Sequence, residues 1–311
     1  MDLFITRYHA LDKTPRYIQD IAWIDTSEKQ DYLLSRTVLD EFCIEYPLPP
    51  SHVRSLLETV VRTCEFEKLE VSEAVYEQLS MSLSKPKISH QYYGSYTINE
   101  NLRVAFRTDA ADSSAFVREG STGFCTWEAG KCLAWYLCHE RKYNTILELG
   151  CGTGVTGIVV SKILGSDYIF TDYHEQTLEQ ARLNCEINGV AAEFKKVDIL
   201  RPVADNSIST DVIVAADILY DTDLCRGLVR WLSSNDVYRE ALIMSTIRTD
   251  ETYDVFKREL DQHRVGIEWS IVHRLPMSQW IEMAGQQWGP FLDSNKRLFD
   301  PVIELVRIVK K

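Results

Sequence analysis

The sequence lacks several features that would assign it to other classes of protein. No apolar run is long enough to span a bilayer, and the first residues lack the apolar core of a signal peptide. There is no internal repeat and no low-complexity tract. Positive charge is in the minority, with 34 Lys and Arg against 46 Asp and Glu and a formal net charge of −12. We therefore expect a cytoplasmic monomer that binds neither a membrane nor nucleic acid directly.

Metal-binding spacings are missing as well. The cysteines include no C-x-x-C pair, and no histidines stand at the spacing that completes a zinc site. Several cysteines occupy apolar positions of expected helices, which favours reduced, buried thiols over disulfides or zinc. The sequence therefore predicts no metal site. The eight cysteines are Cys43, Cys64, Cys125, Cys132, Cys138, Cys151, Cys185 and Cys225.

The hydrophobic pattern divides the 311 residues into a helical accessory domain at 1–88, a β-hairpin connector at 89–120 and an α/β domain at 121–311. Strand-like residues at 91–98 and 102–107 form the expected hairpin. Helical spacing of apolar residues predicts four helices in the first segment. They are expected around 17–24, 32–44, 53–61 and 71–81.

Strands and helices alternate regularly in the third segment. Their order predicts five βα units followed by a terminal antiparallel strand pair, which together make a seven-strand Rossmann-like sheet. No helix-sized pattern separates the last two strands. The strands are expected at 146–149, 168–171, 193–197, 212–216, 241–245, 267–275 and 302–309.

The segment Thr145-Ile-Leu-Glu-Leu-Gly-Cys-Gly-Thr-Gly-Val-Thr-Gly157 ends the first of these strands in a glycine-rich turn. Glycines at Gly150, Gly152 and Gly154 let the backbone turn sharply and approach a ligand closely. The last six residues also match the dinucleotide pattern G-x-G-x-x-G, and Asp172 follows at the distance of a ribose-binding acid. A nicotinamide-dependent oxidoreductase is therefore one open interpretation.

Glu148 favours a different cofactor. It stands two residues before Gly150, where a carboxylate directed into the turn would repel a pyrophosphate. The ribose and amino group of S-adenosylmethionine would tolerate that carboxylate, because this ligand carries cationic groups and no phosphate. Glu148 therefore favours a methyltransferase over an oxidoreductase.

Acidic residues stand at the carboxyl ends of three expected strands, where ligands bind in open α/β sheets. Asp172 would accept hydrogen bonds from both ribose hydroxyls, or it would only cap the following helix. Asp198 would accept the adenine amino group, or it is a plain loop residue. Asp217 would orient the acceptor amine or anchor the backbone, while Tyr220 would form an aromatic wall beside the acceptor. The alternative is a strand end with a buried tyrosine.

Trp127 lies in a glycine-flanked loop before the α/β core. A tryptophan there could cover the methionine end of the cofactor and contact its sulfonium favourably. The alternative is a core anchor for the hairpin.

These segments, in this order, resemble family 16 of the seven-strand S-adenosylmethionine methyltransferases, a largely lysine-directed group of protein methyltransferases. The similarity runs from Thr122 to the C-terminus. It includes the segments Thr126-Trp-Glu-Ala129, Leu147-Glu-Leu-Gly-Cys-Gly-Thr-Gly154, Asp172 and Ala216-Asp-Ile-Leu-Tyr220. Cofactor contacts are thereby implied for Trp127, Glu148, Gly150, Cys151, Gly152, Gly154, Asp172, Asp198, Ile199 and Ala216. Family members often carry tryptophan where this chain has Ile199, so a differently lined adenine pocket is expected.

Within that family, the helical N-terminal extension is most similar to members that methylate elongation factor 2. The Gly123-to-Trp127 loop and the segment Asp172-Tyr-His174 are also most similar to those members. The resemblance implies methyl transfer from S-adenosylmethionine to a lysine of elongation factor 2, with Asp217 and Tyr220 shaping the lysine channel. Another protein substrate and a non-catalytic scaffold remain alternatives. Residues 276–300, which include two tryptophans and two glycines, are expected to contact the protein substrate.

Overall fold

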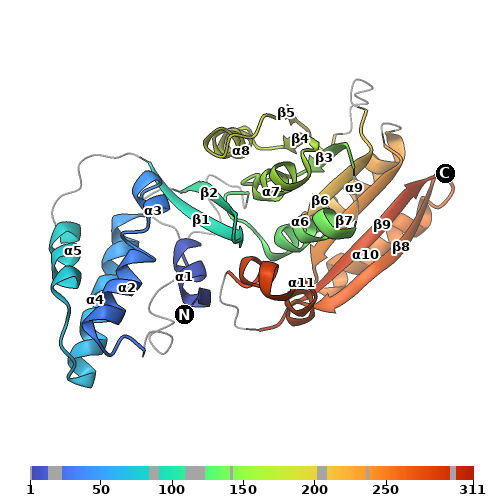
Figure 1. Cartoon of the computed structure of the whole chain (residues 1–311). Coiled ribbons are helices and arrows are strands. Elements are labelled where there is room, and N and C mark those ends of the chain that lie inside the picture. Colours follow the sequence, from blue (N-terminus) through green and yellow to red (C-terminus); the bar gives the residue numbers. More distant parts are fainter. Residues whose placement is uncertain are drawn as a thin grey trace. The chain divides into compact units, whose positions relative to one another are not determined.

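Figure 1 shows the computed structural model of the chain. It describes residues 2–12, 23–83, 91–108, 123–140, 143–201, 209–235, 238–294 and 299–311. The chain divides into two compact units, Met1–Ala115 with Asp293–Lys296 and Phe116–Leu292 with Arg297–Lys311. Within the described ranges, no helix has both the length and the apolar character needed to cross a membrane.

Helices and one hairpin make up the described part of the N-terminal unit. The side chains that form its core come mainly from the first four helices. Strands β1 and β2 pair antiparallel, as the sequence predicted. The elements are α1 (Asp2–His9), α2 (Ser27–Ser35), α3 (Glu41–Glu45), α4 (Pro50–Glu67), α5 (Glu73–Leu83), β1 (Tyr92–Asn99) and β2 (Leu102–Thr108).

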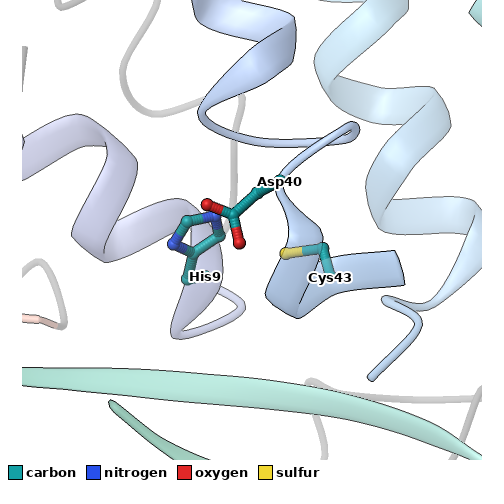
Figure 2. A group of neighbouring side chains, drawn as sticks. All are labelled: His9, Asp40 and Cys43. Atoms are coloured by element: carbon teal, nitrogen blue, oxygen red, sulfur yellow. The ribbon is translucent and has the colours of Figure 1, made fainter. Parts of the chain in front are cut away.

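In this unit one helix was missed, one prediction falls mostly on residues outside the described ranges, and one prediction was wrong. Helix α1 was not predicted, and most of the helix expected at 17–24 lies outside the described residues. The helix expected at 32–44 is two helices, because Asp40, which precedes α3 (Figure 2), caps a new one. Its carboxylate accepts a hydrogen bond from the Phe42 backbone nitrogen at 3.1 Å. A local cap thus overrides the continuous apolar spacing.

The second unit is built on the seven-strand sheet that the sequence predicted. Its strand order is β5-β4-β3-β6-β7-β9-β8. The first five strands are parallel, and β9 runs antiparallel to both of its neighbours. The strands are β3 (Thr145–Leu149), β4 (Asp167–Asp172), β5 (Glu193–Lys196), β6 (Val212–Ala216), β7 (Glu240–Thr246), β8 (Ile267–Pro276) and β9 (Val302–Lys310).

Helices pack along this sheet in two groups. Helices α8, α7, α6 and α11 form one row of neighbours, and α9 pairs with α10 (Figure 1). Among the described residues, helices follow β3, β4, β6, β7 and β8 directly. Central strands such as β6 are buried along nearly their whole length, which explains their continuous apolar runs. The helices are α6 (Glu128–Glu140), α7 (Val155–Leu164), α8 (Glu175–Ile187), α9 (Thr222–Ser234), α10 (Asp250–Gln262) and α11 (Met277–Leu292).

Helix α11 corrects the prediction that no helix separates the last two strands. Its periodicity was hidden because Gly285 breaks the helix with φ 63° and ψ −167°, and Pro290 follows in the same element. Trp280 and Trp288 are buried, at 0% and 3% exposed. Since these tryptophans pack inside the second unit, they are not available to contact a protein substrate.

Replacing Trp280 with alanine should therefore destabilise the second unit. Its ring packs edge-on against Trp135 and His273, and its indole nitrogen donates to the Ile303 carbonyl oxygen at 3.3 Å. Truncating a buried tryptophan costs about 3–5 kcal/mol of unfolding free energy, measurable by urea denaturation. Met283→Ala, on the same helix and 45% exposed, is the control and should change it by less than about 0.5 kcal/mol. Equal losses in both variants would contradict the buried placement.

Candidate active site

A pocket opens at the carboxyl ends of the central strands of the second unit. Ten of the twelve residues that the sequence assigned to the site line it, while Gly154 and Asp198 do not. The ten are Trp127, Glu148, Gly150, Cys151, Gly152, Asp172, Ile199, Ala216, Asp217 and Tyr220. This edge of the sheet is where parallel α/β folds bind ligands.

The glycine turn forms the floor of the pocket between β3 and α7. Gly150 and Gly152 have φ values of 67° and 55°, a left-handed conformation that strains any other residue. A Cβ on Gly150 would lie 2.7 Å from Ile218 Cγ2, and one on Gly152 would lie 3.0 Å from the Gly123 carbonyl oxygen. Both positions therefore require glycine. Gly154 instead begins α7 as its N-cap.

The Asp172 carboxylate is fixed by backbone donors at the end of β4. Its Oδ2 accepts from the Gly152 nitrogen at 3.3 Å, and its Oδ1 accepts from the His174 nitrogen at 2.9 Å. Burial raises its pKa, and these hydrogen bonds oppose that rise. Asp172 thus holds the start of α8, as one interpretation expected, and it also lines the pocket, where its contact with a ribose stays a prediction.

Glu148 is buried beneath the turn, at 1% exposed. The Tyr168 hydroxyl donates to its Oε2 at 3.0 Å. Burial raises the pKa of Glu148 to about 8, although hydrogen bonds from Tyr168 and Thr156 oppose the rise. At neutral pH this carboxyl group is therefore mostly protonated in the ligand-free protein. Glu148 was expected to carry a negative charge, whereas burial makes its charge depend on pH in this pH range.

The Asp217 carboxylate joins three elements. Its Oδ1 accepts from the Thr246 nitrogen at 2.8 Å, and its Oδ2 accepts from the Thr246 hydroxyl at 3.0 Å and from the Ala129 nitrogen at 3.4 Å. These bonds connect the ends of β6 and β7 to the first turn of α6. The backbone of Asp217 is left-handed, with φ 51°. This geometry favours the backbone anchor over the orienting acid.

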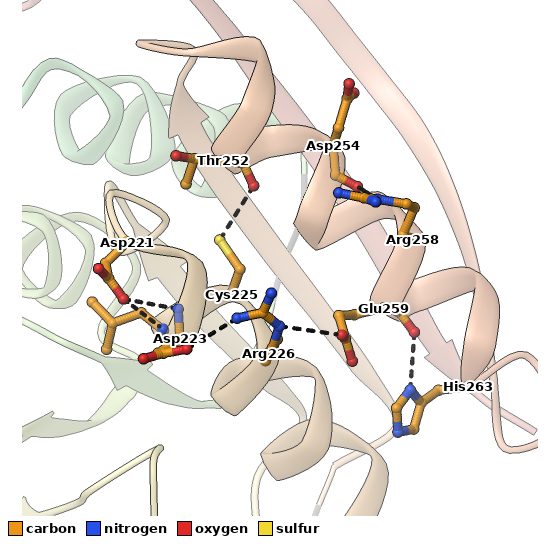
Figure 3. A network of polar contacts seen from close by, with 10 residues as sticks. Asp221, Asp223, Cys225, Arg226, Thr252, Asp254, Arg258, Glu259 and His263 are labelled. Atoms are coloured by element: carbon orange, nitrogen blue, oxygen red, sulfur yellow. Dashed lines mark hydrogen bonds and ion pairs between the residues drawn. The ribbon is translucent and has the colours of Figure 1, made fainter.

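Tyr220 lies at the rim of the pocket and is 58% exposed, so it is not the buried tyrosine of the alternative interpretation. The next residue, Asp221, caps α9 by accepting from the Asp223 nitrogen at 2.8 Å. Arg226 then bridges Asp223 at 3.0 Å and Glu259 of α10 at 3.7 Å (Figure 3). The segment that carries Tyr220 therefore leads directly into α9, and the ion pair of Arg226 with Glu259 links α9 to α10.

Trp127 lines the pocket from the loop before α6. The Arg248 guanidinium carbon lies 4.8 Å from the centroid of its ring, a cation–π contact that the sequence did not predict. Thr126 hydrogen-bonds Thr153 at 2.9 Å through the two hydroxyls, which attaches this loop to the glycine turn.

Thr153 lies in the turn from Gly150 to Gly154 and also lines the pocket. Other lining residues were missed, because small, apolar and hydroxyl side chains carry no recognisable chemistry in a motif. Those at or next to strand ends could have been found from that position, namely Leu149, Tyr173, Val197 and Ile218. The rest come from the loop before α6 and from helices, namely Gly123, Cys125, Thr126, Gly130, Thr156 and Leu224.

The charge of the lining discriminates between the two possible cofactors. Its described residues include three carboxyl groups, on Glu148, Asp172 and Asp217, and no Lys, Arg or His. A ligand bearing phosphates would meet these acidic groups, and Arg248, a cation beside the lining, already contacts the Trp127 ring and interacts with Asp217. The lining fits S-adenosylmethionine, whose sulfonium and ammonium groups are cationic, and it fits a nicotinamide dinucleotide poorly.

Comparison with known proteins agrees with this geometry. A family model described as lysine methyltransferase matches residues 115–263. The protein-lysine N-methyltransferase EEF2KMT of Mus musculus is 32% identical over 268 residues, covering 77% of this chain and 77% of its own length. The Homo sapiens protein of that name is 30% identical over 282 residues, covering 81% and 83%.

A solved structure of the Pyrococcus abyssi tRNA (uracil-54, C5)-methyltransferase in complex with S-adenosyl-L-homocysteine is also similar. It is 17% identical, covers 70% of this chain and 44% of its own, and has a TM-score of 0.45.

The fold and the pocket define an S-adenosylmethionine-dependent methyltransferase. With the family match and relatives at 30% identity and above, the chain belongs to the lysine methyltransferase family and is a protein-lysine N-methyltransferase. Its methyl donor is S-adenosylmethionine, and the oxidoreductase interpretation is set aside.

The raised pKa of Glu148 predicts a pH-dependent loss of stability that Glu148→Gln removes. Since the folded pKa is about 8 and the ordinary value is 4.5, the folded state binds more protons between these limits. The free energy of unfolding of the natural protein should therefore fall as pH rises from 5 to 8, by at most about 1.4 kcal/mol per pH unit from this group.

Urea denaturation at several pH values measures the difference between Glu148→Gln and the natural protein, which should grow in favour of the variant as pH rises. Glu282→Gln, at an exposed position, is the control and should follow the natural protein. Parallel profiles for all three proteins would contradict a raised pKa of Glu148 in the folded state.

Proposed function

We propose that this chain transfers a methyl group from S-adenosylmethionine to a lysine side chain of elongation factor 2, acting as a cytoplasmic monomer. The observation that carries the proposal is the length of the match to relatives named EEF2KMT. It covers 77% and 81% of the chain, whereas the family model covers only residues 115–263. A similarity that extends beyond the catalytic domain supports a shared protein substrate as well as a shared reaction.

The cofactor would be held by the lining of the pocket. Asp172 would accept hydrogen bonds from the ribose hydroxyls, and Trp127 would cover the methionine end. The backbone from Gly150 to Gly154, with Cys151 between the glycines, would support the rest of the nucleoside. Ile199 and Ala216, which follow β5 and end β6, would line the adenine pocket. Asp198 lies outside that lining and would accept the adenine amino group from beside it. The Oδ1 atom of Asp198 already accepts from the Leu200 nitrogen at 2.9 Å.

S-adenosylmethionine supplies a methyl group on a sulfonium, which the lysine Nζ attacks in line. The protein must hold the neutral amine in line with the bond between the methyl group and the sulfur, in a site that contains little water. The lysine proton must leave to water first, and the apolar wall of Tyr220 favours the neutral amine by desolvation. Asp217 would act as a positioning residue, because its oxygens bind Thr246 and Ala129 and fix the strand end that leads to Tyr220.

Labelled methyl transfer tests the substrate. The purified chain, incubated with labelled S-adenosylmethionine and a cell lysate, should label one band at the mass of elongation factor 2, and mass spectrometry should find the methyl group on lysine. A labelled band of another size would support the methyl transfer reaction but exclude elongation factor 2 as the substrate. Binding of S-adenosylhomocysteine without any labelled protein would favour the non-catalytic scaffold.

Tyr220→Ala should lower kcat/KM for the protein substrate by roughly 10- to 100-fold, because the acceptor loses its aromatic wall. Tyr220→Phe keeps the ring and should stay within about threefold of the natural protein. Calorimetry should find the same affinity for S-adenosylhomocysteine in all three. Full activity of the alanine variant would contradict the proposed channel.

Asp172→Ala should weaken binding of S-adenosylhomocysteine by roughly 10- to 100-fold, the loss expected for hydrogen bonds to a charged acceptor. Asp167, at the opposite end of the same strand and exposed, provides the matched control. Calorimetry on Asp167→Ala should give the natural affinity. A response of the natural protein to NADH in place of S-adenosylhomocysteine would overturn the assigned cofactor.

A further inference from the structure

Three side chains of types that bind transition metals converge in the N-terminal unit (Figure 2). His9 ends α1, Asp40 caps α3, and Cys43 lies in the first turn of α3. One ligand atom of each lies within 4.8 Å of those of the other two. Among the residues that the structure describes, this is the only such group of His, Cys, Asp and Glu.

The His9 imidazole is the member of this group whose burial the described contacts do not account for. It is 2% exposed, and its Nε2 atom has no hydrogen-bond partner. Its ring also interacts with the backbone of Arg36. A backbone contact of this kind orients the imidazole of many metal-bound histidines through the nitrogen that does not bind the metal. A buried nitrogen without a partner is costly, so the position calls for a ligand.

Asp40 and Cys43 complete a suitable donor set. Both hydrogen bonds described for the Asp40 carboxylate fall on Oδ1, from the Phe42 nitrogen at 3.1 Å and from Arg103 Nη1 at 2.6 Å. Its second oxygen can therefore bind a metal while the first stays oriented by the protein. Cys43 is 6% exposed and supplies a sulfur atom.

Arg103 is the competing cation. Its Nη2 atom lies 3.7 Å from Cys43 Sγ, and its Nη1 pairs with Asp40. The guanidinium therefore satisfies the carboxylate and contacts the sulfur, but it leaves His9 Nε2 without a partner. An ion pair alone does not account for the buried imidazole.

We propose that His9 Nε2, an oxygen of Asp40 and Cys43 Sγ bind Zn²⁺ in the N-terminal unit, with water as the fourth ligand. Mixed nitrogen, sulfur and oxygen donors suit zinc and disfavour magnesium and calcium. On binding, the Cys43 thiol gives its proton to water as the sulfur–metal bond forms. The metal joins the end of α1 to the start of α3, so its role is to stabilise this unit.

Metal titration of the full chain tests the site. The purified protein, stripped with a chelator and dialysed, is titrated with Co²⁺, and thiolate-to-cobalt absorption is followed. Retained zinc is counted by plasma mass spectrometry. We expect one equivalent of metal per chain and a melting temperature that rises with zinc.

Cys43→Ala should remove the thiolate-to-cobalt band and weaken zinc binding at least about tenfold. Cys64→Ala is the matched control, because Cys64 is a buried cysteine of the same hydrophobic core and lies outside the cluster. It should retain the band and the stoichiometry. Should Cys43→Ala fail to fold, His9→Gln provides a second test, with the band retained but the affinity reduced.

Three results would overturn the proposal. The first is natural protein that takes up no cobalt or zinc above the buffer level. The second is an equal response of the Cys43→Ala and Cys64→Ala variants to metal. The third is uptake by Arg103→Gln but not by the natural chain, which would mean that the guanidinium occupies the position permanently.

Discussion

The pocket depends on two positions of the glycine turn, after β3, at which the backbone has no room for a side chain. Gly150 and Gly152 are left-handed, and each faces a neighbour close enough to exclude a Cβ. This lets β3 turn into α7 within a few residues and brings the Gly152 nitrogen to the Asp172 carboxylate at 3.3 Å. The turn thereby sets the position of the carboxylate at the end of the neighbouring strand. The shape of this part of the pocket therefore follows from two glycines, before any catalytic side chain is considered.

Burial determines how the acidic groups of the pocket behave. Glu148, Asp172 and Asp217 all have raised pKa values, with burial as the largest cause. Asp172 and Asp217 accept hydrogen bonds from backbone nitrogens, which favour their charged forms, while Glu148 accepts from hydroxyls and has a pKa of about 8. A cationic ligand would favour ionisation of all three. Such a lining favours a cationic ligand, because each buried carboxyl group gains a compensating charge when that ligand binds.

The sequence predicted features that depend on local order. The glycine turn, the strand ends and the seven-strand sheet follow from motifs and periodicity, and the structure contains them. Prediction from the sequence failed where a single residue changes the local geometry. Asp40 starts a second helix, and Gly285 interrupts α11. It could not foresee that Asp217 binds Thr246 and Ala129, because these contacts join elements far apart in the chain.

The same limit applies to the proposed zinc site. His9 and Asp40 belong to the ends of different helices, with α2 between them in the sequence, so no spacing rule for cysteine and histidine detects them. Cysteine counting predicted no metal because it considers only neighbours in sequence. Packing instead brings an unpartnered imidazole to a thiol and a carboxylate that share an arginine. Whether metal or guanidinium neutralises this cluster therefore depends on the free energy of burying His9 Nε2 without a partner, and that cost favours the metal.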